Sequence, residues 1–224
     1  MTRRPFTRRR AHAGLLAVLA GLGLVAGCGG SLPPPDWKLN ARDALATHDK
    51  HYLGGDSRLA ELNFAKARQA IAASGRTDLL ARAELARCAT HDAALAFDDC
   101  PAYRAVAADA SDGERAYARF LSGEWSGLDA AALPAHYAGL LGARDDAARL
   151  AALAAIGDPL ARLVAAALLF RQSLLPPAGI ALAIDTASER GWRRPLLAWL
   201  RIEARRAEAA GDAERLALLQ RRIG

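Results

Sequence analysis

The sequence has few of the residues from which β-sheets and many active sites are built. Aromatic residues make up 6% of its 224 residues, and it contains only three cysteines. No segment alternates apolar and polar residues over the length of a strand, and the cysteines include no Cys-x-x-Cys redox pair. Alanine, leucine, arginine and glutamate, all good helix formers, dominate instead. We therefore expect an all-α fold.

Catalytic motifs are also missing. There is no phosphate-binding glycine loop and no His-Glu-x-x-His. Ser126 lies one place too late for Gly-x-Ser-x-Gly, and no predicted strand precedes it. We therefore expect neither an enzyme nor a cofactor or metal site. The alternative is an envelope hydrolase acting on cell wall or lipid, which predicts that Glu61, Glu84 or His91 converge in a deep pocket with a perturbed pKa.

The first 27 residues contain no acidic residue. They hold five of the chain's 30 lysines and arginines. The whole chain has 24 aspartates and glutamates. A chain cut before Cys28 would therefore be nearly neutral. This balance argues against nucleic acid as a partner, despite a sequence pI of about 9.7.

These residues are arranged as a secretory leader. Arg3, Arg4 and Arg8–Arg10 form a basic start, and 13–27 is an uncharged apolar run, shorter than the ~20 residues of a membrane-spanning helix. Val25-Ala26-Gly27-Cys28 resembles the lipobox of bacterial lipoproteins. The resemblance implies that Cys28 receives a diacylglycerol on its sulfur, that a peptidase cuts before it, and that the new amino terminus is acylated.

The resemblance also suggests where the protein is sorted. Gly29 stands where an aspartate would favour retention in the inner membrane, so we expect an outer-membrane anchor on the periplasmic side, with the inner membrane as the alternative. An ordinary signal peptide is the other interpretation. Arg3-Arg4 and Phe6 also resemble the twin-arginine export motif, although Thr7 replaces the usual leucine.

The rest of the chain is expected to form one domain. We predict a signal peptide over 1–27, a lipidated cysteine with a proline-rich spacer over 28–35, and a helical domain over 36–224. Because an exported protein meets an oxidising compartment, Cys88 and Cys100 are expected to form a disulfide.

Glycine, aspartate and proline mark the ends of the predicted helices. Gly-Asp pairs at 55–56, 157–158 and 211–212 predict a left-handed glycine followed by an aspartate cap, and Ser111 with Glu114 fits a capping box. The predicted helices are 36–53, 57–73, 77–95, 101–109, 112–122, 133–141, 144–156, 159–171, 177–190, 193–210 and 212–222. The apolar 160–170 segment is expected to be the buried helix of the core.

Two helix pairs resemble tetratricopeptide repeats. Gly55 with Ala60, Phe64 and Ala67 matches the turn glycine and the second-helix positions of that family, and 197–223 forms a weaker second unit. The resemblance implies antiparallel helix pairs stacked as a right-handed superhelix. An irregular helical bundle is the alternative.

Two groups of polar residues are candidate sites. Arginines crowd the last two predicted helices, and they could bind carboxylates or phosphates, or instead form a solvated face; the candidate partner-binding residues are Arg193, Arg194, Arg201, Arg205 and Arg206. His48 and His51, three apart, could share a metal with Asp49 or His91, but we expect surface histidines near a turn.

These features together predict a binding module. Lipoproteins with tetratricopeptide-like domains commonly assist the assembly of envelope machinery, so the resemblance implies an outer-membrane-anchored scaffold for protein–protein interaction. Its expected partners are membrane lipid, through acylated Cys28, and an envelope protein. A purely structural lipoprotein is a further alternative.

Overall fold

The computed structural model describes residues 33–224, and within that range every regular element is a helix. The all-α prediction is confirmed. The α-helices are α1 (Asp36–Gly54), α2 (Ser57–Ala72), α3 (Thr77–Asp92), α4 (Pro101–Arg104), α5 (Asp112–Ser122), α6 (Ala138–Gly142), α7 (Asp146–Ala155), α8 (Pro159–Arg171), α9 (Pro177–Glu189), α10 (Arg193–Ala209) and α11 (Ala213–Ile223). Short 3-10 turns occur at Ala107–Asp109, Ala130–Ala132 and Ala135–Tyr137.

Side-chain caps begin the helices where the sequence predicts them. Asp56, Asp158 and Asp212 accept hydrogen bonds from backbone N–H groups three residues ahead, at 2.9, 2.7 and 2.9 Å. Ser111 and Glu114 form the expected capping box. Each such cap typically contributes about 1 kcal/mol. Two of the three predicted left-handed glycines, Gly55 and Gly211, have positive φ, whereas Gly157 does not.

Two predicted helices are wrong in length. The segment 101–109 is divided into α4 and a 3-10 turn, and 133–141 holds a 3-10 turn followed by the short α6. Alanine favours helix at both places, but each segment also buries a tyrosine, Tyr103 or Tyr137. Burial of these rings decides the backbone here, because a short segment gains little from helix propensity alone.

The core is centred on α8. Every residue from Leu163 to Leu169 is at most 1% exposed, and the helix packs against α3, α7 and α9. The prediction of a buried core helix at 160–170 is therefore confirmed. Among the described residues, no helix combines the length and apolarity needed to cross a membrane.

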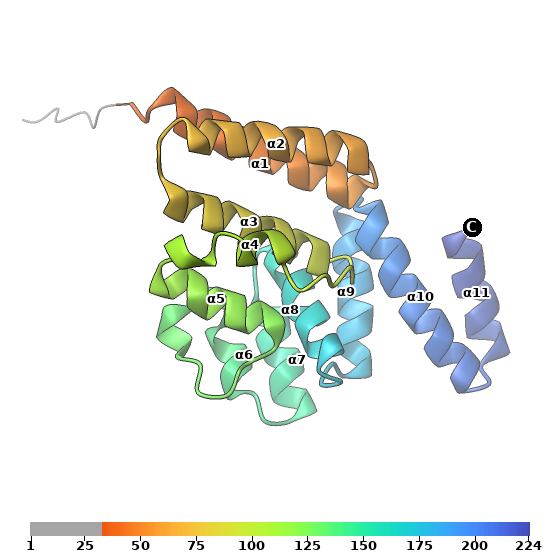
Figure 1. Ribbon diagram of the computed structural model, residues 1–224. Helices are drawn as coiled ribbons and strands as arrows, with labels where there is room; N and C mark the ends of the chain where they lie inside the picture. Colours follow the sequence, from red (N-terminus) through yellow and green to blue (C-terminus); the bar gives the residue numbers. More distant parts are fainter. Residues whose placement is uncertain (1–32) are drawn as a thin grey trace, which may run out of the picture. The chain divides into compact units, whose positions relative to one another are not determined.

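The first two helices form an antiparallel hairpin that lies along α3 (Figure 1). Ala60, Phe64, Ala67 and Ile71, the predicted apolar face of α2, are all buried. At the other end of the chain, α10 and α11 form a second hairpin, and α10 also contacts α1. This contact brings the arginine-rich helix to the α1–α2 turn.

Candidate functional site

A cluster of aromatic and histidine rings fills the junction of α1, α2 and α3. His48 on α1 is completely buried, and its ring centroid lies 5.3 Å from that of Phe64 and 6.2 Å from that of His91. The rings of Tyr52 and His91 stack at 4.1 Å. We call His48, Tyr52, Phe64 and His91 the ring cluster. It brings two histidines together that are 43 positions apart in the sequence.

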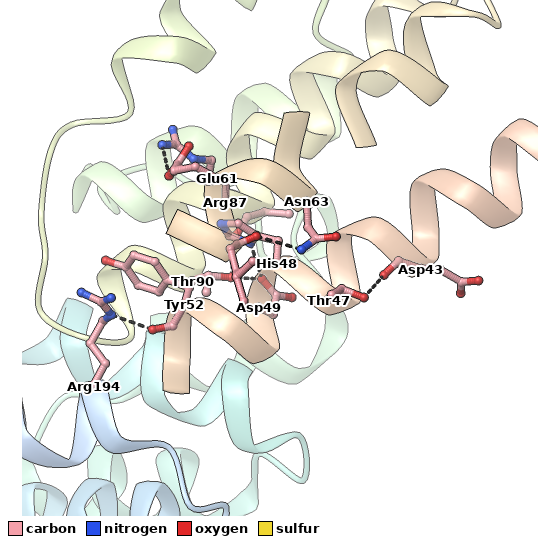
Figure 2. Close-up of polar contacts among 12 residues, drawn as sticks. Asp43, Thr47, His48, Asp49, Tyr52, Glu61, Asn63, Arg87, Thr90 and Arg194 are labelled. Atoms are coloured by element: carbon pink, nitrogen blue, oxygen red, sulfur yellow. Dashed lines mark hydrogen bonds and ion pairs between the residues drawn. The ribbon is translucent and has the colours of Figure 1, made fainter. Parts of the chain in front are cut away.

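A carboxylate fixes the tautomer of His48. Its Nδ1 lies 3.0 Å from Oδ1 of Asp49, and the hydroxyl of Thr90 donates to the same oxygen at 2.8 Å (Figure 2). Because a carboxylate only accepts, Nδ1 of His48 must carry the proton. In the neutral imidazole Nε2 then holds the lone pair, and within residues 33–224 this atom has no hydrogen-bond partner.

His91 also has a carboxylate near its ring, but at a longer distance. Its Nδ1 lies 4.0 Å from Oδ2 of Asp98, and its Nε2 is also buried without a partner in the described part of the chain. Burial, reinforced by the positive charge of Arg87, lowers the pKa of His91 from 6.5 to about 4. His91 is therefore neutral at pH 7.

Two glutamates lie near this cluster, but neither is a free acid. Glu61 on α2 accepts a hydrogen bond from Arg87 at 2.7 Å (Figure 2). Glu84 is 3% exposed, and burial raises its pKa although Arg68 lies 3.1 Å away. One ligand atom from each of His48, Glu61 and His91 lies within 4.8 Å of the others, a group that excludes Glu84.

Four cavities of 430 to 680 Å³ in residues 33–224 are lined by other residues than Glu61, Glu84 and His91. Glu61 and His91 thus lie close together, as the hydrolase alternative requires. Neither of them lines any of these four cavities.

The structure separates the two histidines that the sequence paired. His51 is partly exposed and belongs to no potential metal-binding group among the described residues, whereas His48 points into the helix junction. The expectation of surface histidines is wrong for His48, because α1 presents it, together with Tyr52 one turn later, to α3. This i, i+4 pair of ring side chains was the signal that could have identified the buried face.

The candidate arginines have different surroundings. Arg194 donates to the carbonyl of Tyr52 at 2.6 Å and to Ser57 Oγ at 2.7 Å, with its guanidinium 4.3 Å above the Tyr52 ring (Figure 2). It therefore joins α10 to the α1–α2 turn. Arg206 pairs with Glu203 at 2.6 Å.

The other three candidates, Arg193, Arg201 and Arg205, are exposed. None of them forms an ion pair with another described residue. Arg193, Arg194, Leu197 and Arg201 line an open cavity of 680 Å³ together with the turn 54–57. We call this cavity the arginine groove.

A further cavity lies beneath α3, α5 and α8 and was not foreseen from the sequence. Its volume is 540 Å³, and its lining includes Asp49, Thr90, Tyr117 and Tyr137. Burial raises the pKa of Tyr117 to about 12, so its phenol stays protonated. The cavity is therefore lined by neutral phenols beside apolar side chains, with charged groups such as Arg82 and Glu114 also in its lining.

One of the three cysteines lies outside the described residues, and the other two lie within them. Cys28, the predicted lipidation site, lies outside them, as does the predicted signal peptide. Cys88 and Cys100 are joined in a disulfide, with their Cα atoms 5.5 Å apart. The backbone N–H of Cys100 donates to Asp98 at 3.0 Å. The disulfide thus holds the segment that carries Asp98 next to His91.

Comparison of the chain with models of known protein families, with curated proteins and with solved structures finds no match. What the helical domain does must therefore be argued from its own geometry.

Proposed function

We propose that the protein is a lipid-anchored binding module of the bacterial cell envelope. Acylated Cys28 tethers it to the outer membrane, and the arginine groove receives an acidic segment of a partner protein. The proposal assigns no catalysis and no cofactor. It combines the lipobox-like sequence before Cys28 with the surface chemistry of the helical domain.

The arginine groove is the observation that carries the proposal. It places three of the five candidate arginines around one open cavity, although they come from two different turns of α10. Arg194 is already used to hold the α1–α2 turn. Arg193 and Arg201 are exposed and form no ion pair with another residue of the described part.

The position of Arg193 supports an anionic partner. It stands in the first turn of α10, where the helix dipole favours negative charge, and no acidic residue occupies that turn. Guanidinium groups can bind carboxylates through two parallel hydrogen bonds, so an acidic peptide segment suits this surface. Asp56 lies in the groove as well, but its carboxylate accepts the N–H of Leu59 as a cap.

Photocrosslinking in living bacteria tests this function. A photoreactive amino acid at position 201 should form an adduct with an envelope protein, and Arg193→Glu should reduce that adduct strongly. The same probe at position 222 on α11, also exposed but outside the groove, is the matched control. Equal adducts from both positions, or adducts with lipid alone, would overturn the proposal.

The anchor is tested separately by fractionation. The unchanged chain should sediment with outer membranes, and its processing should stop when the lipoprotein signal peptidase is inhibited with globomycin. Cys28→Ser should release the chain from the membrane or leave it unprocessed. A variant that fractionates like the unchanged chain would remove Cys28 as the anchor.

A further inference from the structure

We propose that His48, His91 and Glu61 form a binding site for a divalent transition-metal ion of the zinc type. The three residues come from three consecutive helices, and one ligand atom of each lies within 4.8 Å of the others. Two imidazoles and one carboxylate are a ligand set that suits such ions. This inference is independent of the function proposed above.

The histidine lone pairs are the first argument. Asp49 accepts the Nδ1 proton of His48, so in the neutral imidazole Nε2 is the donor atom for a metal. Nε2 of His48 and Nε2 of His91 are both buried, and neither finds a hydrogen-bond partner within residues 33–224. A buried polar atom left in this state destabilises the fold, and a metal bond would offset that cost.

His48 is also oriented as a metal ligand is. A ligating imidazole usually donates its second N–H to a carboxylate, which fixes its tautomer and increases its basicity. Asp49 does this for His48 at 3.0 Å, and Thr90 in turn fixes Asp49. Asp98 Oδ2 lies 4.0 Å from Nδ1 of His91, near the ring but beyond hydrogen-bond distance.

Glu61 supplies the third ligand and the route of entry. Its side chain is 52% exposed, whereas that of His48 is completely buried. One carboxylate oxygen accepts from Arg87, and the other remains for the ion. Zinc bonds to nitrogen and oxygen are about 2.0–2.2 Å long, so the ligands must close in from their present separation.

Arg87 sets a limit on the affinity. Its charge lies beside Glu61 and 5.1 Å from the Phe64 ring centroid, where it opposes a second cation. The carboxylates of Glu61, Asp49 and Asp98 counter this charge. The bound ion would join α1, α2 and α3, so its effect on the domain is a cross-link between the hairpin and the helix beneath it.

Zinc titration of the full chain, purified in detergent without a histidine tag and without reductant, tests the site. The chain should bind one Zn²⁺ after chelator treatment, with a rise in Tm because the ion binds the folded state. His48→Ala and His91→Ala should each weaken binding by more than the ~10–100-fold typical of a lost outer-shell partner. Asp49→Asn removes such an outer-shell partner of His48 and should weaken zinc binding by about 10–100-fold.

His51→Ala is the matched control, since it removes a histidine of the same helix from outside the site. It should leave the zinc affinity unchanged. Because His48→Ala removes a buried side chain, Glu61→Gln serves as the second variant: it changes a half-exposed group, keeps an acceptor for Arg87, and should still weaken binding. Circular dichroism checks that each variant is folded.

Cobalt absorption provides an independent readout. Bound Co²⁺ should show the visible bands of a four-coordinate nitrogen–oxygen site, and these should be lost in His91→Ala. Three results would overturn the proposal: no zinc bound by the unchanged chain, zinc bound equally well by folded His48→Ala and His91→Ala, or a cobalt spectrum with sulfur ligation.

Discussion

The helices α1–α3 and the helices α7–α9 bury very different side chains. The first group buries His48, Glu84, Thr90 and Asp92, whereas the only polar residue buried in the second is Thr186. The two groups of helices contact each other through α3 and α8. The same domain therefore contains an apolar half and a half rich in buried polar groups.

This difference indicates what each half contributes. Burial of apolar surface stabilises the fold by roughly 25 cal/mol per Å², and α8 with its neighbours supplies it. Buried polar atoms without partners reduce stability. We infer that α1–α3 is shaped by binding and α7–α9 by stability, and the following changes test this contrast.

The largest effect is expected in the apolar half. Leu168→Ala should lower the free energy of unfolding by about 2–5 kcal/mol, because Leu168 is 0% exposed and its removal leaves a cavity. Urea denaturation measures the change. Leu62→Ala, at a residue that is 50% exposed, is the control and should change stability by less than about 0.5 kcal/mol. Equal losses from both variants would contradict the assigned core.

The disulfide comes next. Cys88 and Cys100 are 12 positions apart, so the chain-entropy relation predicts a loss of about 3 kcal/mol when the bond is absent. Cys100→Ser should show this loss in urea denaturation, and a reductant should produce it in the unchanged chain. If reductant leaves the midpoint unaltered, the two thiols are free in the purified protein.

The pH dependence should reveal His91. Since its pKa is about 4 in the folded chain and 6.5 in the free side chain, the unfolded chain binds more protons between these values. Stability should therefore fall as the pH drops from about 6.5 to about 4, by on the order of 2 kcal/mol from this residue.

His91→Gln should lack this component. The difference in unfolding free energy between the two chains, measured along the pH series, isolates it. Asp92 acts in the opposite sense, since burial raises its pKa to about 7, but it is present in both chains and cancels. A constant difference from pH 4 to 7 would contradict the assignment.

The smallest effect is expected at Glu84. Replacing this buried carboxylate in Glu84→Leu should leave stability unchanged or raise it by about 1 kcal/mol, because burial of the charge is only partly offset by Arg68. The measurement is again urea denaturation at pH 7. If Glu84→Leu lowered the free energy of unfolding as much as Leu168→Ala, this contrast would be contradicted. The α1–α3 group would then depend on Glu84 as strongly as the α7–α9 group depends on Leu168.

Local sequence signals predicted much of the fold. Asp56, Ser111, Asp158 and Asp212 act as caps because a cap needs only its own helix. The buried face of α2 followed from the spacing of Ala60, Phe64, Ala67 and Ile71. Residues 101–109 and 133–141 were harder, since packing of single tyrosines overrides alanine's preference there.

The candidate sites depended on contacts between distant segments. His48 meets His91 only because the α1–α2 hairpin packs on α3, whereas spacing along α1 paired His48 with His51 and left His91 as a conceivable neighbour. Arginine crowding indicated a binding surface in α10, but it could not show that Arg194 is used internally or that Arg193 and Arg201 share a cavity with the α1–α2 turn. The lipobox-like leader lies outside the described residues, so the anchor remains a prediction.

The export and tethering of this domain are central to the account, and intact-mass spectrometry of the chain extracted from bacterial membranes without reductant tests both directly. The account predicts a chain that begins at Cys28, carries acyl groups on that residue, and has lost the thiol hydrogens of Cys88 and Cys100. An unprocessed, unacylated chain that begins at Met1 and keeps both thiols would contradict it.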